Sequence, residues 1–157
     1  MITVDKFGGS GITYELFEWM ITNIPLGSTV LELGAGHVST KFLSEKYKLY
    51  SVEDKLEFIG KYSSNYIYAP IDISINWYNV ASLKDHLPSS YDCILVDGPT
   101  GEGNRYGFLT NIDLFKKDIP IIVDDTWREG ERKLLIDLSE KLKRSYVSFE
   151  NFSIITP

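Results

Sequence analysis

The sequence of 157 residues contains one cysteine, two histidines and no long apolar run. A single thiol, Cys93, cannot form an internal disulfide, so a reducing compartment is compatible with the chain. Its apolar neighbours indicate a buried structural thiol. Residues 1–10 lack the apolar core of a signal peptide. No apolar stretch approaches the ~20 residues that a membrane-spanning helix needs. We therefore expect a cytoplasmic protein with no membrane partner.

Positive charge is also scarce, because 16 Lys and Arg residues face 22 Asp and Glu residues and the formal net charge is −6. This balance argues against non-specific nucleic-acid binding, which needs a basic face. Hydrophobic residues make up 43% of the chain and charged residues 24%, a mixture typical of one globular domain. We expect an N-terminal lid and helix over residues 1–27 and a core over residues 28–157.

Hydrophobic patterning predicts alternating strands and helices. Ile12, Leu16, Met20 and Ile24 recur at helical spacing behind a capping Thr13. Strands are predicted at 29–33, 48–53, 66–69, 91–96 and 119–123. Helices are predicted at 39–47, 55–62, 77–86, 107–117 and 129–142, and a terminal hairpin at 146–149 and 152–155. This order predicts a Rossmann-like, doubly wound α/β fold with a mostly parallel seven-stranded sheet, an antiparallel terminal hairpin and helices on both faces.

A glycine-containing turn follows the first predicted strand. Residues 29–40 read TVLELGAGHVST, which places Gly34, Ala35 and Gly36 between a strand and a helix. Glycine allows positive φ and lets a ligand lie against the backbone. We expect free N–H groups of the turn, and the start of the following helix, to face a bound ligand. Gly8-Gly9-Ser10-Gly11 forms either a flap over that ligand or a plain N-terminal lead.

Acidic residues stand at or just after the ends of the predicted strands: Glu32, Glu53, Asp72, Asp97, Asp124 and Asp125. Ligands bind at this edge of open α/β sheets. Carboxylates gathered there would repel one another, so a cationic ligand, a metal or both are expected. Each acid also has a simpler interpretation. Glu32 could only cap the turn, Glu53 or Asp54 could cap a helix, Asp72 could be solvated, and Asp125 could serve a Thr126-x-x-Glu129 capping box.

Four runs, LELGAGHVSTKFL, YSVEDKLEF, YDCILVDGP and IPIIVDDTWREGE, resemble the class I S-adenosylmethionine-dependent methyltransferases. The resemblance is closest to small-molecule members of the catechol type, with their VDG and DD motifs. It implies that the glycine turn admits the methionine end of S-adenosylmethionine, with Glu32 near the ammonium, Glu53 at the ribose and Asp72 near the adenine. The implied cofactor residues are Glu32, Gly34, Ala35, Gly36, Glu53, Asp54, Asp72 and Asp97. The chain departs from the family's third glycine, because Val38 stands there.

The resemblance also implies a metal site. Asp97, Asp124 and Asp125 match the metal-ligand pattern of catechol-type O-methyltransferases and would suit Mg²⁺ or another divalent cation. Such an ion would bind substrate oxygens and lower a hydroxyl's pKa. The alternative is a set of carboxylates that only cap and contact substrate. The lysine that follows the strand-four acid in that family is absent from residues 98–102.

Candidate catalytic residues are Asp97 and His37, since an unperturbed imidazole titrates near neutral pH. His37 could equally pack against the cofactor. Arg105, Tyr106, Trp127 and Arg128 are candidate substrate residues, with Trp77 as a further pocket aromatic, although solvated or core positions would also explain them.

We predict an enzyme that transfers a methyl group from S-adenosylmethionine to a small-molecule acceptor, a hydroxyl oxygen, with or without a metal. One alternative is a non-catalytic nucleoside-binding module. A second, a nicotinamide-dependent oxidoreductase, is disfavoured by the missing glycine and the absence of a substrate domain. A homo-oligomer in which a partner subunit completes the pocket is also compatible with the short lid.

Overall fold

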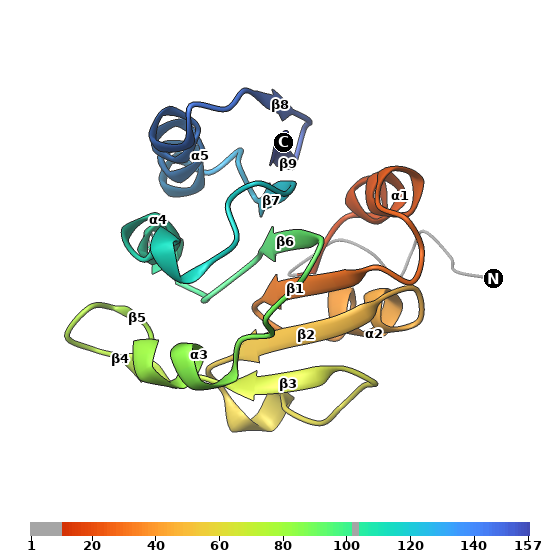
Figure 1. Ribbon diagram of the computed structural model, residues 1–157, viewed down its shortest axis with the longest axis vertical. Helices are drawn as coiled ribbons and strands as arrows, with labels where there is room; N and C mark the ends of the chain where they lie inside the picture. The colour runs from red at the N-terminus through yellow and green to blue at the C-terminus, as the bar shows by residue number, and fades with distance from the viewer. Residues whose placement is uncertain (1–10, 102–103) are drawn as a thin grey trace.

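The computed structural model describes residues 11–101 and 104–157. Of the predicted flap, Gly8-Gly9-Ser10-Gly11, only Gly11 lies within the described residues. A seven-stranded sheet forms the centre, in the order β3-β2-β1-β6-β7-β9-β8 (Figure 1). Its strands are β1 (Thr29–Leu33), β2 (Lys48–Glu53), β3 (Asn65–Tyr68), β6 (Cys93–Val96), β7 (Ile121–Asp124), β8 (Tyr146–Ser148) and β9 (Phe152–Ile155).

The pairing confirms the predicted topology. The five strands β3, β2, β1, β6 and β7 are parallel to one another, whereas β9 pairs antiparallel with both β7 and β8. From β1 the chain moves outward to β3 and then returns to place β6 on the other side of β1. Strand order therefore reverses between β1 and β6, and ligands bind beyond the carboxyl ends of the strands at such a point.

Helices cover both faces of the sheet, as predicted (Figure 1). α1 (Tyr14–Asn23) and α2 (Ser39–Ser44) lie on one face; α3 (Val80–His86), α4 (Gly107–Thr110) and α5 (Glu129–Leu142) lie on the other. Side chains of β6 alternate between the two cores: Cys93 and Leu95 face α1 and α2, and Ile94 and Val96 face the opposite layer. Burial on both faces explains the almost continuous apolar sequence of this strand.

Several predicted helices are shorter in the structure. The segment 55–62 contains only a 3₁₀ turn, Leu56–Phe58, and α4 ends at Thr110 before a second turn, Ile112–Leu114. Trp77–Tyr78 is not helical but forms β5, which pairs antiparallel with β4 (Ile71–Asp72). The helix begins after Asn79, whose side-chain oxygen accepts from the Ser82 amide at 2.9 Å.

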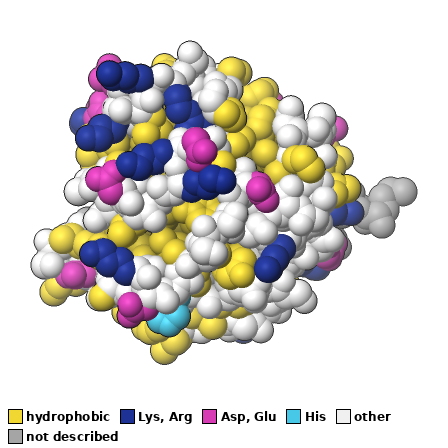
Figure 2. Space-filling view, in the orientation of Figure 1, with side chains coloured by type: hydrophobic (Ala, Val, Ile, Leu, Met, Phe, Trp, Pro, Cys, Tyr) yellow, Lys and Arg dark blue, Asp and Glu magenta, His cyan; other side chains and the backbone are white. Residues whose placement is uncertain are grey.

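Other local predictions are confirmed. The hydroxyl of Thr13 accepts from the Leu16 amide at 3.3 Å, which caps α1. α5 has the predicted bounds, and Cys93 is fully buried. Among residues 11–101 and 104–157 no helix is long and apolar enough to cross a membrane. The face drawn in Figure 2 carries basic and acidic side chains interleaved rather than separated.

Candidate functional site

A cavity of about 270 Å³ opens at the carboxyl ends of β1, β2 and β6, where the strand order reverses. This volume is just below the ~300–1,000 Å³ usual for small-molecule sites. Much of the wall comes from three loops that follow these strands. The lining residues are Gly11, Gly34–Ser39, Glu53–Lys55, Phe58, 97–100 and Arg105. The structure thus brings together Gly34, Ala35, Gly36, His37, Glu53, Asp54, Asp97 and Arg105, which the sequence had predicted as site residues.

The loops after β1 and β6 meet at two glycines. Gly34 has a φ of +96°, and a Cβ atom there would lie 2.5 Å from the carbonyl oxygen of Asp97. A Cβ on Gly98 would lie 2.8 Å from the Cα of Gly34 and 2.5 Å from the hydroxyl of Tyr78. Both positions therefore need glycine for backbone packing, before any ligand is considered.

The N–H groups of the turn are not free, contrary to the sequence prediction. The amide of Gly34 donates to the carbonyl of Val52 at 2.9 Å, because the turn continues the β1–β2 pairing. The amide of Ala35 donates to Glu53 Oε2 at 3.0 Å, and that of Gly36 to Thr40 Oγ1 at 2.9 Å. What the turn offers to a ligand is bare backbone surface rather than unpaired donors.

Glu32 lies beneath the turn instead of in the cavity. Its Oε2 accepts from the hydroxyls of Thr40 at 2.8 Å and Ser51 at 2.7 Å, while Oε1 has no partner among the described residues. Burial raises the pKa of Glu32 to about 7, although the nearby hydroxyls lower it. Glu32 is not among the residues that line the cavity, and its place near the cofactor's ammonium stays a prediction. The carboxylate holds Thr40, which in turn holds the Gly36 amide.

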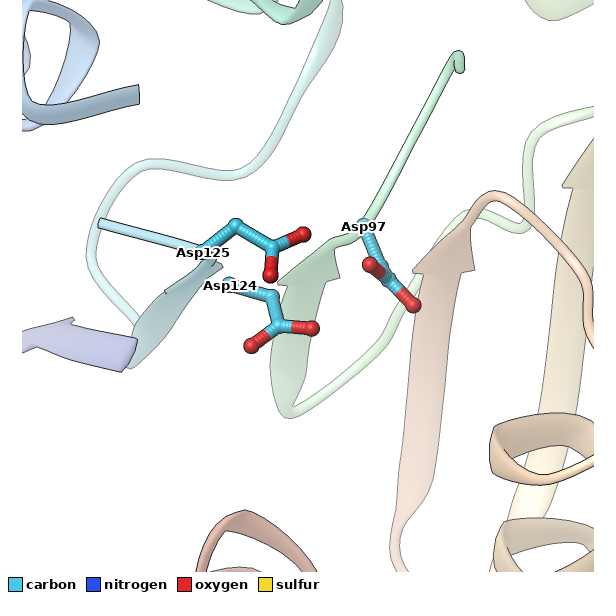
Figure 3. Close-up of side chains that lie close together, drawn as sticks. All are labelled: Asp97, Asp124 and Asp125. Atoms are coloured by element: carbon cyan, nitrogen blue, oxygen red, sulfur yellow. The ribbon is translucent and has the colours of Figure 1, made fainter. Parts of the chain in front are cut away.

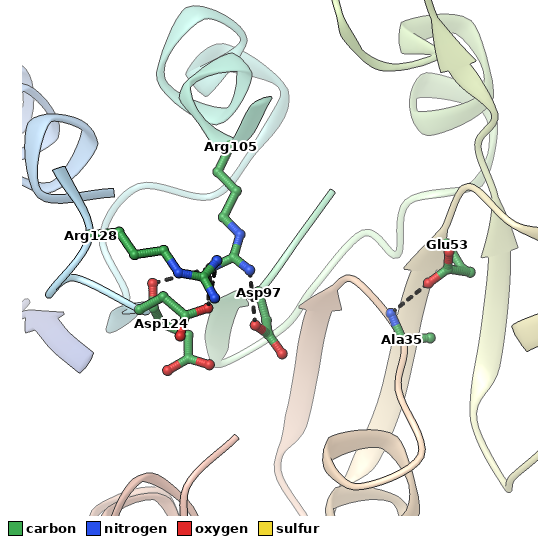
Figure 4. A network of polar contacts seen from close by, with 7 residues as sticks. Ala35, Glu53, Asp97, Arg105, Asp124 and Arg128 are labelled. Carbon is green, nitrogen blue, oxygen red and sulfur yellow. Dashed lines mark hydrogen bonds and ion pairs between the residues drawn. The ribbon is translucent and has the colours of Figure 1, made fainter. Parts of the chain in front are cut away.

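Glu53, at the end of β2, accepts a hydrogen bond from the same turn and also lines the cavity (Figure 4). Oε2 accepts from Ala35, and Oε1 accepts from the amides of Asp54 at 3.0 Å and Lys55 at 2.9 Å. Burial and the neighbouring Asp54 together raise the pKa of Glu53 to about 7, although the backbone hydrogen bonds from Lys55 and Ala35 oppose the rise. Three backbone donors thus fix a carboxylate at the cavity wall.

His37 also belongs to the cavity wall. Its Nδ1 is 3.3 Å from the hydroxyl of Tyr62, and its ring meets the edge of Phe58 with 5.5 Å between centroids. Both His37 and Phe58 line the cavity. The cavity wall therefore carries an aromatic pair as well as the acids Glu53, Asp54 and Asp97.

Asp97, Asp124 and Asp125 converge at the ends of β6 and β7, as predicted (Figure 3). One carboxylate oxygen from each lies within 4.8 Å of those of the others. Asp125 takes a left-handed conformation with a φ of +60°. The predicted capping box is wrong, because the Thr126 hydroxyl pairs with that of Ser153 at 2.7 Å and the N-cap of α5 is Arg128.

A buried cation, Arg105, lies among these acids and comes from the 3₁₀ turn Asn104–Tyr106 (Figure 4). Arg105 is only 5% exposed. Its Nη2 is 3.4 Å from Asp97 Oδ1, and its Nη1 is 3.0 Å from Asp125 Oδ2. Nη1 also donates to the main-chain carbonyl of Asp124 at 3.2 Å. Arg105 therefore pairs with two of the three carboxylates that could hold a metal ion.

The pKa values of Asp97 and Asp124 are raised even though Arg105 lies beside them. Burial, then the neighbouring Asp124, raises the pKa of Asp97 well above its usual range, and Arg105 opposes that rise. Burial, then Asp125, raises the pKa of Asp124 to about 6. Burial alone would lower the pKa of Arg105, but Asp97 and Asp125 outweigh it and the net shift is upward.

No protein-family model matches the sequence, and no curated protein matches it. Solved structures are similar in fold. They include the MycE methyltransferase of the mycinamycin pathway in complex with Mg, SAH and mycinamycin VI (12% identity, TM-score 0.57, 90% of this chain and 45% of that one). The C-terminal domain of precorrin-6Y C5,15-methyltransferase from Rhodobacter capsulatus (12%, 0.58, 95% and 90%) is also similar, as is the E. cuniculi Mtq2–Trm112 complex, responsible for methylation of the eRF1 termination factor (18%, 0.54, 96% and 96%).

The chain has the class I methyltransferase fold. It spans less than half the length of the MycE chain that it matches. The acceptors named for the three similar structures differ, so the shared fold does not select one of them.

Within this methyltransferase fold, some predicted residues lie away from the cavity wall. Asp72, at the β4–β5 hairpin, accepts from the amide and hydroxyl of Ser74. The hydroxyl of Tyr106 donates to Asp137 at 2.7 Å. Trp127 is 58% exposed, with the guanidinium of Arg128 5.1 Å from its ring centroid. Trp77 is fully buried in the core and does not line the pocket, contrary to expectation.

Sequence reasoning missed the residues that support the turn. Thr40 and Ser51 bind Glu32, and Gly98 packs against Gly34. Gly98 could have been predicted, because it directly follows Asp97 at the end of a strand, where the loops after β1 and β6 approach each other. Thr40 and Ser51 could not, since isolated hydroxyl residues are common in helices and strands.

Proposed function

We propose that the cavity binds S-adenosylmethionine and that the protein is a methyltransferase acting on a small-molecule acceptor, at a hydroxyl oxygen. The carrying observation is the position of the cavity. It lies at the strand-order reversal of a class I methyltransferase fold, over a side-chain-poor turn. Glu53, Asp54 and Asp97 stand in its wall.

The cavity's lining fits this cofactor. S-adenosylmethionine carries an ammonium and a sulfonium, and carboxylates favour such a ligand. Three acids, Glu53, Asp54 and Asp97, line the cavity beside two basic residues, Lys55 and Arg105. Gly34, Ala35 and Gly36 present no side chain larger than a methyl group, so a ligand can lie against the main chain. Phe58 and His37 supply an aromatic wall suited to a flat purine.

When bound, S-adenosylmethionine supplies a methyl group on a positively charged sulfur. The protein's task is then to orient the acceptor in line with that group and to take its proton. Asp97 lines the cavity, and burial raises its pKa. Because its carboxylate lines the cavity, Asp97 is the first candidate to accept the proton of the acceptor. His37 is the second candidate base in the same wall.

The acceptor is proposed to be a hydroxyl compound rather than an anion. Arg105, expected from the sequence to hold a substrate carboxylate or phosphate, donates instead to Asp125 and the Asp124 carbonyl and pairs with Asp97. Its positive charge is therefore already paired with acidic groups of the protein and does not select an anionic substrate. The divalent metal predicted from the sequence stays a prediction, and the ion pairs of Arg105 argue against it.

Gly36→Leu tests the cofactor site without breaking the fold. A Cβ at Gly36 would meet only Ser39 Oγ, at 3.5 Å, which is ordinary contact, yet the residue lines the cavity. S-adenosylhomocysteine at 100 times its Kd should add ~2.7 kcal/mol to wild-type stability. For a chain of this size that raises the Tm by roughly 5–10 °C. The variant should keep the unliganded Tm within a few degrees and lose this shift.

NAD should produce no shift in either protein. A shift with NAD alone would support the oxidoreductase, and none with either ligand would refute the cofactor assignment. Methyl transfer is then measured with a labelled methyl group on a panel of phenols, sugars, amines and carboxylates. Binding of S-adenosylhomocysteine without transfer to any of them would favour the non-catalytic module.

A further inference from the structure

Arg105 occupies the position that a divalent cation would need. Its guanidinium reaches the carboxylates of both Asp97 and Asp125, at 3.4 and 3.0 Å, and the main chain of Asp124 at 3.2 Å. These are the three residues whose carboxylate oxygens lie within 4.8 Å of one another. Figure 4 shows the side chain entering from the Asn104–Tyr106 turn, across from the ends of β6 and β7.

The charge balance of the cluster also favours a built-in cation. Arg105 is 5% exposed, so it cannot exchange its partners for water without leaving the fold's interior. Arg128, which is partly exposed, adds a second positive group 3.6 Å from Asp125 Oδ2. Two guanidinium groups therefore face three carboxylates. A dication placed among the same oxygens would stand close to both guanidinium groups and be repelled by them.

Arginine also fits the geometry in a way that lysine would not. The planar guanidinium presents several N–H groups in fixed directions and can bridge acids on different strands. Here Nη1 donates to the Asp124 carbonyl of β7 and to the carboxylate of Asp125, and Nη2 pairs with the carboxylate of Asp97 after β6. The bridge fixes the orientation of Asp97, the one carboxylate of the three that lines the cavity.

We infer that Arg105 replaces a divalent metal: the bridge from Asp97 to Asp125 makes this a metal-independent site, and Arg105 is a positioning residue for Asp97. The inference that the cluster binds no metal rests only on the ion pairs of Arg105 and Arg128. The positioning role rests on the proposed methyltransferase function.

The test is a titration of the full chain with Mn²⁺ alone. Binding is detected by calorimetry and by the electron paramagnetic resonance signal of free Mn²⁺. Wild type should bind no Mn²⁺ at this cluster up to 1 mM added ion (about 1 mM is the weak end of ordinary binding). Arg105→Met removes the charge but keeps much of the length, and should bind one Mn²⁺ at least tenfold more tightly. Adding Asp124→Asn to Arg105→Met should abolish the gain.

Lys133→Met is the matched control. It also deletes one positive charge, but from an exposed pair with Asp137, so it should leave Mn²⁺ binding as in wild type. Stoichiometric Mn²⁺ binding by wild type that Asp124→Asn removes would overturn the inference. So would an Arg105→Met protein that folds, by circular dichroism, and binds Mn²⁺ no better than wild type. The wild-type titration decides the metal question even if Arg105→Met does not fold.

The positioning role has its own readout. Methyl transfer by wild type should be unchanged by EDTA, and Arg105→Lys should lower kcat at least tenfold with little change in the Kd for S-adenosylhomocysteine. An EDTA-sensitive wild type that binds S-adenosylhomocysteine would refute the arginine bridge and leave the proposed function standing. A wild type that binds neither Mn²⁺ nor S-adenosylhomocysteine would refute the proposed function and leave the bridge standing.

Discussion

Glu32→Gln should stabilise the protein at pH 8 and leave its stability almost unchanged at pH 4.5. The wild-type carboxylate is fully buried, one of its oxygens has no partner among the described residues, and its pKa rises to about 7 from an ordinary value of 4.5. Gln keeps a carbonyl oxygen to accept from Thr40 and Ser51, and it carries no charge. It therefore mimics the protonated acid at every pH.

The sign follows from proton linkage. Between pH 4.5 and 7 the folded protein keeps the proton on Glu32 while the unfolded chain releases it, so stability falls as the pH rises through this window. Each pKa unit corresponds to 1.36 kcal/mol, and the difference amounts to about 3 kcal/mol above pH 7. That is a large part of the ~5–15 kcal/mol typical of a domain.

Urea unfolding of wild type and Glu32→Gln at pH 4.5, 6 and 8 measures this. With an m value of about 2 kcal/mol/M, the midpoint of the variant should exceed that of wild type by roughly 1–2 M at pH 8. Glu53→Gln is the contrasting variant. Both oxygens of Glu53 accept backbone N–H groups, so an amide NH₂ must oppose one donor. A midpoint difference for Glu32→Gln that does not change with pH would refute the buried-charge argument.

Three further changes test the turn and its surroundings. Gly34→Ala should destabilise by about 2–5 kcal/mol, since positive φ and a 2.5 Å approach to Asp97 both oppose a Cβ; thermal unfolding that matches wild type would contradict this. Thr40→Val breaks the link from Glu32 to the Gly36 amide and should cost about 1–3 kcal/mol and weaken S-adenosylhomocysteine binding, measured by calorimetry. Arg144→Met removes the donor to four main-chain carbonyls, those of Lys117, Ile119, Ile155 and Thr156. It should lower stability by about 1–3 kcal/mol with an unchanged Kd for S-adenosylhomocysteine, and a weakened Kd would show that the site depends on this distant contact.

Elements buried by their own sequence pattern could be predicted. The run of residues 93–96 is apolar throughout because both faces of β6 are covered, and α5 shows its apolar stripe directly. Trp77 and Tyr78 were misassigned because pairing with Ile71 and Asp72 overrides the weak helical pattern. The Thr126-x-x-Glu129 pattern failed for the same kind of reason, since Ser153, 27 residues away, takes the threonine hydroxyl.

The candidate site was predictable in position but not in its internal contacts. That the strand ends converge follows from parallel pairing, so Glu53, Asp97, Asp124 and Asp125 could be placed at one edge. Nothing in the sequence showed that Glu53 would occupy the Ala35 amide, or that Arg105 would lie between the acids. The Ala35–Glu53 and Arg105–Asp125 contacts join residues 18 and 20 positions apart, and both depend on how the loops fold over the edge.

The most direct test of the central proposal is a crystal structure of the protein grown with saturating S-adenosylhomocysteine. Density for the nucleoside is expected over Gly34, Ala35 and Gly36, with its amino group and sulfur facing the side of the cavity formed by Glu53, Asp54 and Asp97. Density at another surface, or an unfilled turn at a concentration that saturates binding in solution, would contradict the proposal.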